Sequence, residues 1–143
     1  MRQKKGVGGL GWFLAGLLAA AISWVVNSWI TERGGRLGLT VLVPLVEETA
    51  KTGLAVMIGG ELVLVHAVFG SMEALYETCR EQQLGPAIAA FISHLLFGLV
   101  TLSIYQYFNN WVAAILGGTS LHALWNLLII HLFLKPPVGG KES

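Results

Sequence analysis

Residues 42–51 read Leu42-Val43-Pro44-Leu45-Val46-Glu47-Glu48-Thr49-Ala50-Lys51 and lie inside an apolar segment that runs from Leu37 to Ile58. Glu47 and Glu48 are adjacent carboxylates, and Lys51 shares a helical face with Glu47 because the two are four residues apart. If the segment crosses a bilayer, burying these charges is costly unless other groups compensate them. We therefore treat this stretch as a functional-site hypothesis and ask which other segments supply the partners.

The composition is typical of an integral membrane protein. Of the 143 residues, 55% are hydrophobic and only 12% are charged, whereas a soluble domain carries roughly 25% charged residues. A net charge of +1 and the lack of a basic run argue against a nucleic-acid partner. With Cys79 as the only cysteine and no aspartate in the chain, an intramolecular disulfide, a CxxC metal site and a paired-aspartate protease are excluded. We expect a protein of the cell membrane.

The hydropathy pattern predicts an all-α fold, a polytopic membrane helix bundle with about five transmembrane helices in one domain (1–143). A spanning helix needs about 20 mainly apolar residues, and short polar or glycine-rich turns separate such segments here. The expected transmembrane helices are 10–30, 37–58, 61–79, 84–108 and 111–134, with a basic N-terminal tail at 1–9 and a flexible C-terminal tail at 135–143. Frequent glycine and alanine favour close helix contact, and a homodimer is compatible with this pattern.

Each expected helix after the first carries an ionisable residue at a similar depth. Depth is counted from the membrane side where the expected polar turn at 31–36 lies. At about 1.5 Å per residue, Glu47 lies roughly 15 Å deep and Glu73 roughly 9 Å deep. His94 is ten residues into its helix, and His122 is twelve residues from the end of its own. All four fall in a slab of roughly 10 Å, which we interpret as one polar cavity that opens towards that side.

Spacing within single helices adds candidates to this cavity. His122 and Asn126 share a face, as do Phe69 and Glu73, because each pair is four residues apart. Phe69 is expected to shape the cavity by packing, and Lys51 to neutralise a carboxylate. His66 faces roughly the same way as Glu73 but lies deeper, towards the opposite side, and we leave it out of the expected site. Charged residues near the expected helix ends are interpreted as solvated, and they are Glu32, Glu77 and Glu81.

Four motifs in this order resemble the PrsW family of membrane proteases and, more distantly, the type II CAAX-prenyl endopeptidase (CPBP) family. They are Glu47-Glu48-Thr49-Ala50-Lys51, Phe69-Gly70-Ser71-Met72-Glu73, His94 within Ser-His-Leu-Leu-Phe-Gly, and His122-Ala123-Leu124-Trp125-Asn126. The match is nearer to PrsW, because the CPBP pattern has arginine directly after the lysine and histidine where Glu73 stands. The resemblance covers about 43–128 and implies hydrolysis of a peptide bond inside or at the edge of the membrane.

Two mechanisms fit the residues that carry the resemblance. In a glutamate-type protease, Glu47 or Glu48 would deprotonate a water with help from Glu73 or His94. His122 and Asn126 would then hydrogen-bond the developing oxyanion. In a zinc-dependent version, the ligands would be Glu47, Glu73, His94 and His122, with an open coordination position. We favour the metal-free form, because no HExxH motif is present.

The substrate and even the class of function stay open at this point. The resemblance implies a membrane protein or a lipid-modified peptide as the substrate, within the lipid bilayer. A non-catalytic membrane scaffold is an alternative, and so is a small proton-coupled carrier, for which intramembrane glutamate and histidine are equally natural. A serine–histidine dyad is disfavoured, because no GxSG-type sequence is present and the glutamates would be left unexplained. The serines that such a dyad would draw on are Ser71, Ser93 and Ser120.

Overall fold

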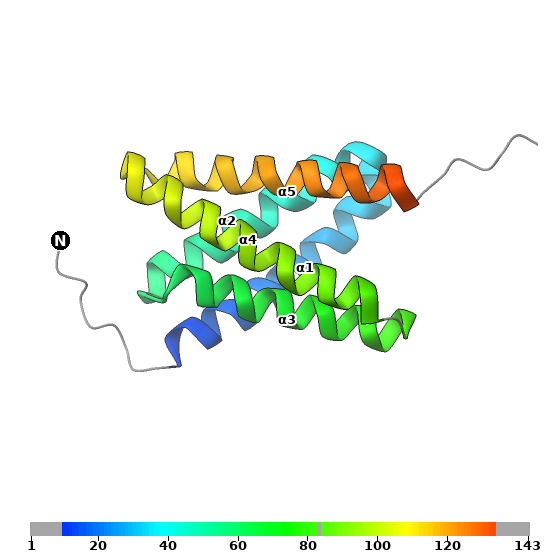
Figure 1. The fold of residues 1–143 in the computed structure, drawn as a ribbon, viewed down its shortest axis with the longest axis horizontal. Coiled ribbons are helices and arrows are strands. Elements are labelled where there is room, and N and C mark those ends of the chain that lie inside the picture. The colour runs from blue at the N-terminus through cyan, green and yellow to red at the C-terminus, as the bar shows by residue number, and fades with distance from the viewer. Residues whose placement is uncertain (1–9, 83, 134–143) are drawn as a thin grey trace, which may run out of the picture.

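The computed structural model describes residues 10–82 and 84–133, and within them it contains helices and short turns but no strand (Figure 1). The elements are α1 (Gly11–Leu37), a π-helical turn η1 (Gly38–Leu42), α2 (Val43–Ile58), α3 (Leu62–Glu81), α4 (Leu84–Phe108) and α5 (Trp111–Phe133). The predicted all-α fold is confirmed for these residues. The tails expected at 1–9 and 135–143 lie outside them.

Three helical segments of the described chain are long and apolar enough to cross a membrane, by length and composition. They are Gly11–Ile58, Leu84–Phe108 and Trp111–Leu132. The first is one helical run of 48 residues that contains α1, η1 and α2. Helix α3 is not in this set, and its apolar sequence is interrupted by His66, Glu73 and Glu77. The membrane character is therefore supported, but the predicted count of about five spans is not confirmed.

The largest difference from the expected boundaries is at the end of α1. We expected a helix to end at Ile30 and a polar turn to follow, but the helix continues to Leu37. The change of direction is concentrated at Gly35, whose φ of 51° and ψ of −142° are non-helical. Glycine reaches such a conformation without the steric penalty of a Cβ atom. The polar residues Thr31, Glu32 and Arg33 therefore extend the helix instead of forming the turn.

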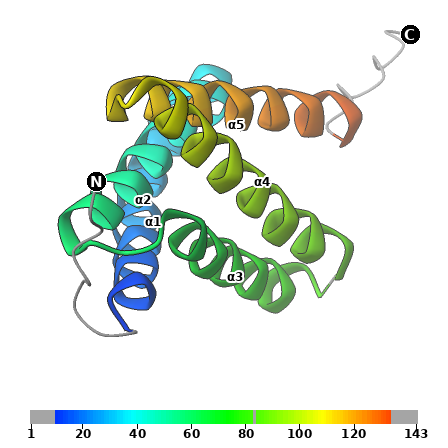
Figure 2. The ribbon, with the colours of Figure 1, turned by 60° about the vertical axis from the view of Figure 1, so that its left-hand side comes forward.

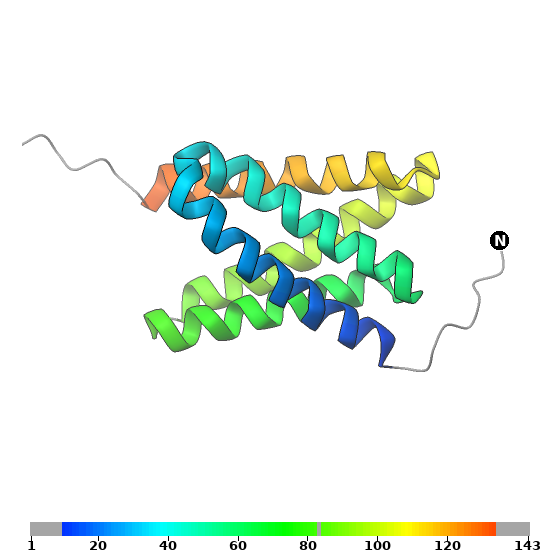
Figure 3. The ribbon, with the colours of Figure 1, turned by 180° about the vertical axis from the view of Figure 1, so that it is seen from behind.

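The helices run along the length of the bundle, and the turns that connect them lie at its two ends (Figures 1 and 3). Helix α3 packs along α4, α4 along α5, and α1 along both α2 and α3. Figure 2 shows the pairing of α3 with α4 from a second direction. At Gly16, a Cβ atom would lie 2.5 Å from Cβ of Val68, so the close approach of α1 to α3 depends on a residue without a side chain.

The interior of the bundle contains an apolar cluster formed by Ala15, Ala55, Leu62 and Val65, but part of the interior is polar, which is unusual for a protein core. Buried polar and charged side chains lie together where α2, α3, α4 and α5 meet. They are Glu47, Glu48, Lys51, Thr52, His66, His94, Thr101 and His122. Large apolar side chains on α1, α3, α4 and α5 point outward and stay exposed. The molecule is therefore apolar on the outside and charged within, as a membrane site requires.

Candidate active site

Glu48 and Lys51 of α2 form a fully buried ion pair at the centre of this polar interior. Both residues are 0% exposed, and Lys51 Nζ lies 2.6 Å from Glu48 Oε1. The pair is three residues apart on one helix, a spacing that brings side chains together. Lys51 Nζ also lies 4.3 Å from the ring centre of Phe69, within the range of a cation–π contact. The residue expected to shape the cavity therefore also contacts its cation.

Two histidines from α4 and α5 contact this ion pair. His94 Nδ1 lies 3.1 Å from Lys51 Nζ, and His122 Nδ1 lies 3.2 Å from Glu48 Oε1. Because an ammonium group only donates, Nδ1 of His94 accepts, and the ring proton is assigned to Nε2. Nε2 of His94 is hydrogen-bonded to Oε2 of Glu73. A continuous chain from Lys51 through His94 to Glu73 thus links α2, α4 and α3.

Glu47 is directed differently from its neighbour Glu48, because adjacent residues point about 100° apart on a helix. Its Oε1 accepts a hydrogen bond of 2.8 Å from Nδ2 of Asn27 in α1. Its Oε2 lies 3.8 Å from both Lys51 Nζ and His122 Nδ1, beyond hydrogen-bonding distance. Of the two adjacent acids, Glu48 is therefore held inside the charge network, and Glu47 is held at its edge by α1.

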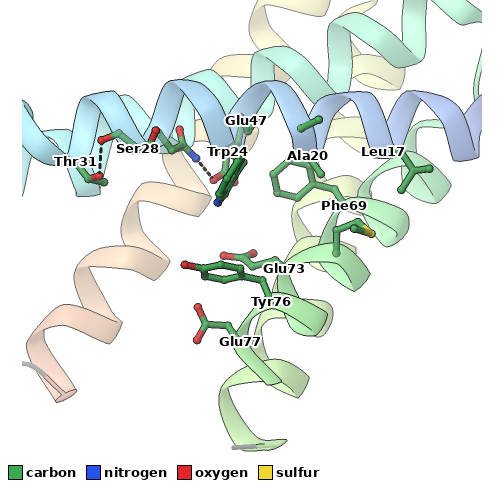
Figure 4. Close-up of a pocket in the computed structure, with 14 residues that line it drawn as sticks. Leu17, Ala20, Trp24, Ser28, Thr31, Glu47, Phe69, Glu73, Tyr76 and Glu77 are labelled. Atoms are coloured by element: carbon green, nitrogen blue, oxygen red, sulfur yellow. Dashed lines mark hydrogen bonds between the residues drawn. The ribbon is translucent and has the colours of Figure 1, made fainter. Parts of the chain in front are cut away.

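A pocket of about 570 Å³ lies between α1 and α3 beside this edge (Figure 4). Figure 4 shows Trp24 of α1 opposite Glu73 and Tyr76 of α3, with Phe69 near Ala20. The walls are mostly apolar, but both Glu47 and Glu73 line the pocket. A molecule in this pocket would meet two carboxylates from two helices, one held by an amide and the other by an imidazole.

The contact network contains five of the six residues that we expected to be catalytic. They are Glu47, Glu48, Glu73, His94 and His122, with Lys51 and Phe69 beside them. The four helices that we expected to place an ionisable group at one depth therefore also turn those groups towards each other. Of these residues, Glu47, Phe69 and Glu73 line the pocket, whereas Glu48, Lys51, His94 and His122 do not.

The sixth residue, Asn126, has a different partner. Its Nδ2 donates to the backbone oxygen of Leu39 at 3.1 Å. In the π-helical turn, the N–H of Val43 bonds to the oxygen of Gly38, five residues back. In the same register the oxygen of Leu39 would need the N–H of residue 44, and Pro44 has none. Asn126 thus satisfies a carbonyl that the proline leaves without its helical donor.

Two polar residues of the site were not predicted, the buried His66 and the partly buried Asn27. His66 is 0% exposed, its Nε2 lies 3.7 Å from Glu48 Oε2, and neither of its ring nitrogens has a hydrogen-bond partner. His66 precedes Glu73 by seven residues, which is about two helical turns, so the sequence already indicated that the two residues share a helical face. Asn27 was overlooked because the first helix has no ionisable residue in its apolar part, yet an amide there is itself unusual.

Two groups of three residues in the described chain bring potential metal ligands within 4.8 Å of one another. One group is Glu47, His94 and His122, and the other is Glu48, His66 and His94. Glu73, which we expected among the zinc ligands, belongs to neither. His94 is common to both groups, and each of its ring nitrogens already has a protein partner, Lys51 on one side and Glu73 on the other.

No protein-family model matches the chain, and no curated protein or solved structure matches it either. The resemblance to the PrsW and CPBP families therefore depends on the four motifs alone.

Proposed function

We propose that the chain is an intramembrane endopeptidase that hydrolyses a peptide bond of a membrane protein or a lipid-modified peptide. The observation that carries the proposal is that Glu47 of α2 and Glu73 of α3 line one pocket in the apolar bundle. Peptide hydrolysis needs a group that removes a proton from water and a group that returns one to the leaving nitrogen. Two positioned carboxylates can share these tasks, and the order of the PrsW-like motifs supports the same class of reaction.

Glu47 is the proposed general base. Asn27 fixes its Oε1, and its Oε2 has no hydrogen-bond partner, so Oε2 can accept a hydrogen bond from a water molecule. As this water attacks the carbonyl carbon of the peptide bond, its proton moves to Glu47 and then to the departing nitrogen when the C–N bond breaks. Glu48 is less suited to this role, because it is fully buried and paired with Lys51.

Glu73 and His94 are proposed to act as a second unit on the opposite wall. Lys51 donates to Nδ1 of His94, so the ring proton of His94 is on Nε2, which donates to Glu73. The pair can therefore hold a proton between imidazole and carboxylate and orient the attacked carbonyl or water. The expected oxyanion donors, His122 and Asn126, do not line the pocket, and we assign His122 to the orientation of Glu48 instead.

We also propose that all five α-helices cross the bilayer. Helix α3 has 20 residues, which matches the length that a span needs. Its polar residues His66 and Glu73 face the charge network, whereas Met72, Leu75 and Tyr76 are exposed. The inward polar face lowers the hydropathy of α3 without removing its apolar outer face. A helix of this kind can span when the polar side chains have protein partners.

Asn126 gives a test of how the site is built. Asn126→Ala is expected to lower the free energy of unfolding by about 0.5–1.5 kcal/mol, the net contribution of a typical hydrogen bond, because the carbonyl of Leu39 loses its donor. The cleavage rate should fall less than tenfold. If Asn126 bound the oxyanion, the rate would fall by about 10²–10³-fold with little loss of stability. Unfolding in mixed micelles and cleavage of a labelled peptide, measured on the same preparation, separate the two.

A zinc-dependent version of the site is the alternative mechanism. Zinc would take ligands from one of the two converging groups, and it would supply a Lewis acid and an activated water when bound. His94 could join either group only by giving up its contact with Lys51 or with Glu73. Lys51 Nζ, 2.6 Å from Glu48 Oε1, would also place an ammonium charge next to the ion. The residues therefore fit a metal-free site better.

The proposal is tested with purified protein in liposomes that contain a single-span peptide labelled at both ends. We expect two fragments whose new carboxyl terminus takes up ¹⁸O from labelled water, at the same rate before and after exhaustive chelation. A rate that falls on chelation and returns with zinc would replace the metal-free mechanism by the metal-dependent one. If no fragment forms with a broad set of peptides, the protease proposal is wrong.

A proton-coupled carrier is supported by one specific observation. The titratable groups continue from Glu73 at the pocket through His94, Lys51 and Glu48 to His66 on the far side of the ion pair. Such a series can pass protons across a bilayer. Proton movement into dye-loaded proteoliposomes, in the absence of peptide fragments, would favour the carrier.

A further inference from the structure

We infer that the pocket between α1 and α3 binds its peptide as an extended strand, with Ser23 and Asn27 of α1 hydrogen-bonding one edge of the peptide backbone. The inference rests on the proposed function for the identity of the occupant, a peptide segment within the membrane. It goes beyond that function because it assigns the conformation of the bound segment and two residues that recognise it.

Helix α1 carries two buried polar atoms without a hydrogen-bond partner, and both belong to residues that line the pocket. They are Oγ of Ser23, a residue that is 1% exposed, and Oδ1 of Asn27. Two hydroxyls further along the same helix also line the pocket, but their own backbone satisfies them. Ser28 Oγ donates to the oxygen of Val25 at 2.8 Å, and Thr31 Oγ1 donates to the oxygen of Ser28 at 3.1 Å. The unsatisfied pair therefore marks one particular part of α1.

The spacing of this pair suits an extended peptide. Ser23 and Asn27 are four residues apart, which is about 6 Å along a helix axis. On one edge of a β-strand, equivalent backbone groups recur every two residues, or about 6.6 Å. Oδ1 of Asn27 can accept one peptide N–H, and the hydroxyl of Ser23 can accept a second N–H or donate to a carbonyl. A helical peptide could not use this pair, because its own backbone groups are already bonded.

An unwound segment inside a membrane needs such partners. Each backbone group that is left without a hydrogen bond in lipid costs several kcal/mol. A peptide bond in a helix, however, has its carbonyl engaged and shielded, so hydrolysis requires unwinding. Asn27 connects substrate binding with catalysis. The amide whose Oδ1 would hold the strand also donates through Nδ2 to Glu47. The peptide bond beside Asn27 would therefore be the one presented to Glu47.

The remaining wall residues fit apolar side chains on the bound strand. Trp24 and Tyr76, which face each other across the pocket in Figure 4, are 66% and 45% exposed. Met72 of α3 lies on the same wall as Tyr76, and a flexible thioether adapts to different side chains. The expected ligand class is therefore an unwound, mainly apolar peptide segment.

The test uses disulfide trapping and does not depend on cleavage. Cys79→Ser removes the only cysteine, and Ala20→Cys places a thiol in the pocket wall. The probe is a peptide of about 20 apolar residues with two central glycines and a single cysteine that is moved through eight successive central positions. In a redox buffer, the trapped fraction is expected to alternate with a period of two, as in a strand. A period near 3.6 would show a docked helix and overturn the inference.

Matched variants test the two assigned residues. Ser23→Ala with Asn27→Ala should reduce trapping about tenfold at the favoured positions, since two hydrogen bonds to the peptide are lost. Ser28→Ala, whose hydroxyl bonds its own helix, should leave trapping unchanged. If the double variant does not fold, Ser23→Ala alone should reduce trapping about threefold. Equal trapping in all variants would mean that the peptide occupies the pocket without these bonds, and the assignment would be wrong.

The outcomes also separate this inference from the protease proposal. Alternating trapping that depends on Ser23 and Asn27, without any fragment, would support strand binding and refute the endopeptidase. Fragment formation with helical or uniform trapping would leave the endopeptidase in place and refute strand binding. Mass spectrometry of the same samples reports both results.

Discussion

Replacing Glu47 by glutamine is expected to lower the rate of peptide cleavage by about 10²–10⁴-fold, the usual contribution of a general base. Glutamine keeps the size of the side chain, and its carbonyl oxygen can still accept the hydrogen bond from Asn27. It cannot take a proton from water. The loss should therefore appear in kcat, and the unfolding midpoint should change little, because Glu47 is not the acid that directly neutralises Lys51.

The matched control for Glu47→Gln is Glu77→Gln. Glu77 lines the same pocket on α3, so its replacement also removes one negative charge from the wall, and it should change the rate less than threefold. Both variants are assayed on the same labelled peptide in liposomes. Equal rates for Glu47→Gln and the parent would show that Glu47 is not the base. Equal losses in both variants would show that the pocket needs negative charge but no particular carboxylate.

The convergence of the site residues could be predicted from the sequence because the rise of a helix is fixed. Each segment boundary located Glu47, Glu73, His94 and His122 along the membrane normal, and the structure places these residues in one network. Errors of a few residues at helix ends did not matter, since each shifts the depth by only about 1.5 Å.

The direction of each side chain could not be predicted in the same way, because it depends on how the helices rotate against each other. The sequence left Glu47 and Glu48 equivalent, and only the position of α1 shows that Asn27 holds one of them. Asn126 shares a face with His122, but the π-helical turn at Pro44 brings a free carbonyl within its reach. His66 was judged too deep, although the close approach at Gly98, where a Cβ would lie 2.8 Å from Cβ of His66, brings α4 against it.

Removing the central cation should have the largest effect on stability. In Lys51→Met, the fully buried Glu48 loses its partner at 2.6 Å, and His94 loses the donor to its Nδ1. Breaking a buried ion pair in this way costs about 3–5 kcal/mol, because one charge stays inside without compensation. The free energy of unfolding in mixed micelles measures this loss. Conversion of Met72 to leucine is the control, since it changes a residue of similar size on the pocket wall without touching the pair.

The double variant Glu48→Gln with Lys51→Met decides whether the loss comes from charge or from packing. If the unpaired carboxylate is the cause, neutralising it should recover most of the stability, because replacing both members of a buried pair is often nearly neutral. The coupling energy between the two sites would then reach about 2–3 kcal/mol, near the upper end for residues in contact. Losses that simply add would mean that Lys51 acts through its aliphatic stem and Phe69. In that case the ion pair with Lys51 would not be what stabilises the buried carboxylate of Glu48. His122, which also contacts Glu48, would then be the main partner of that carboxylate.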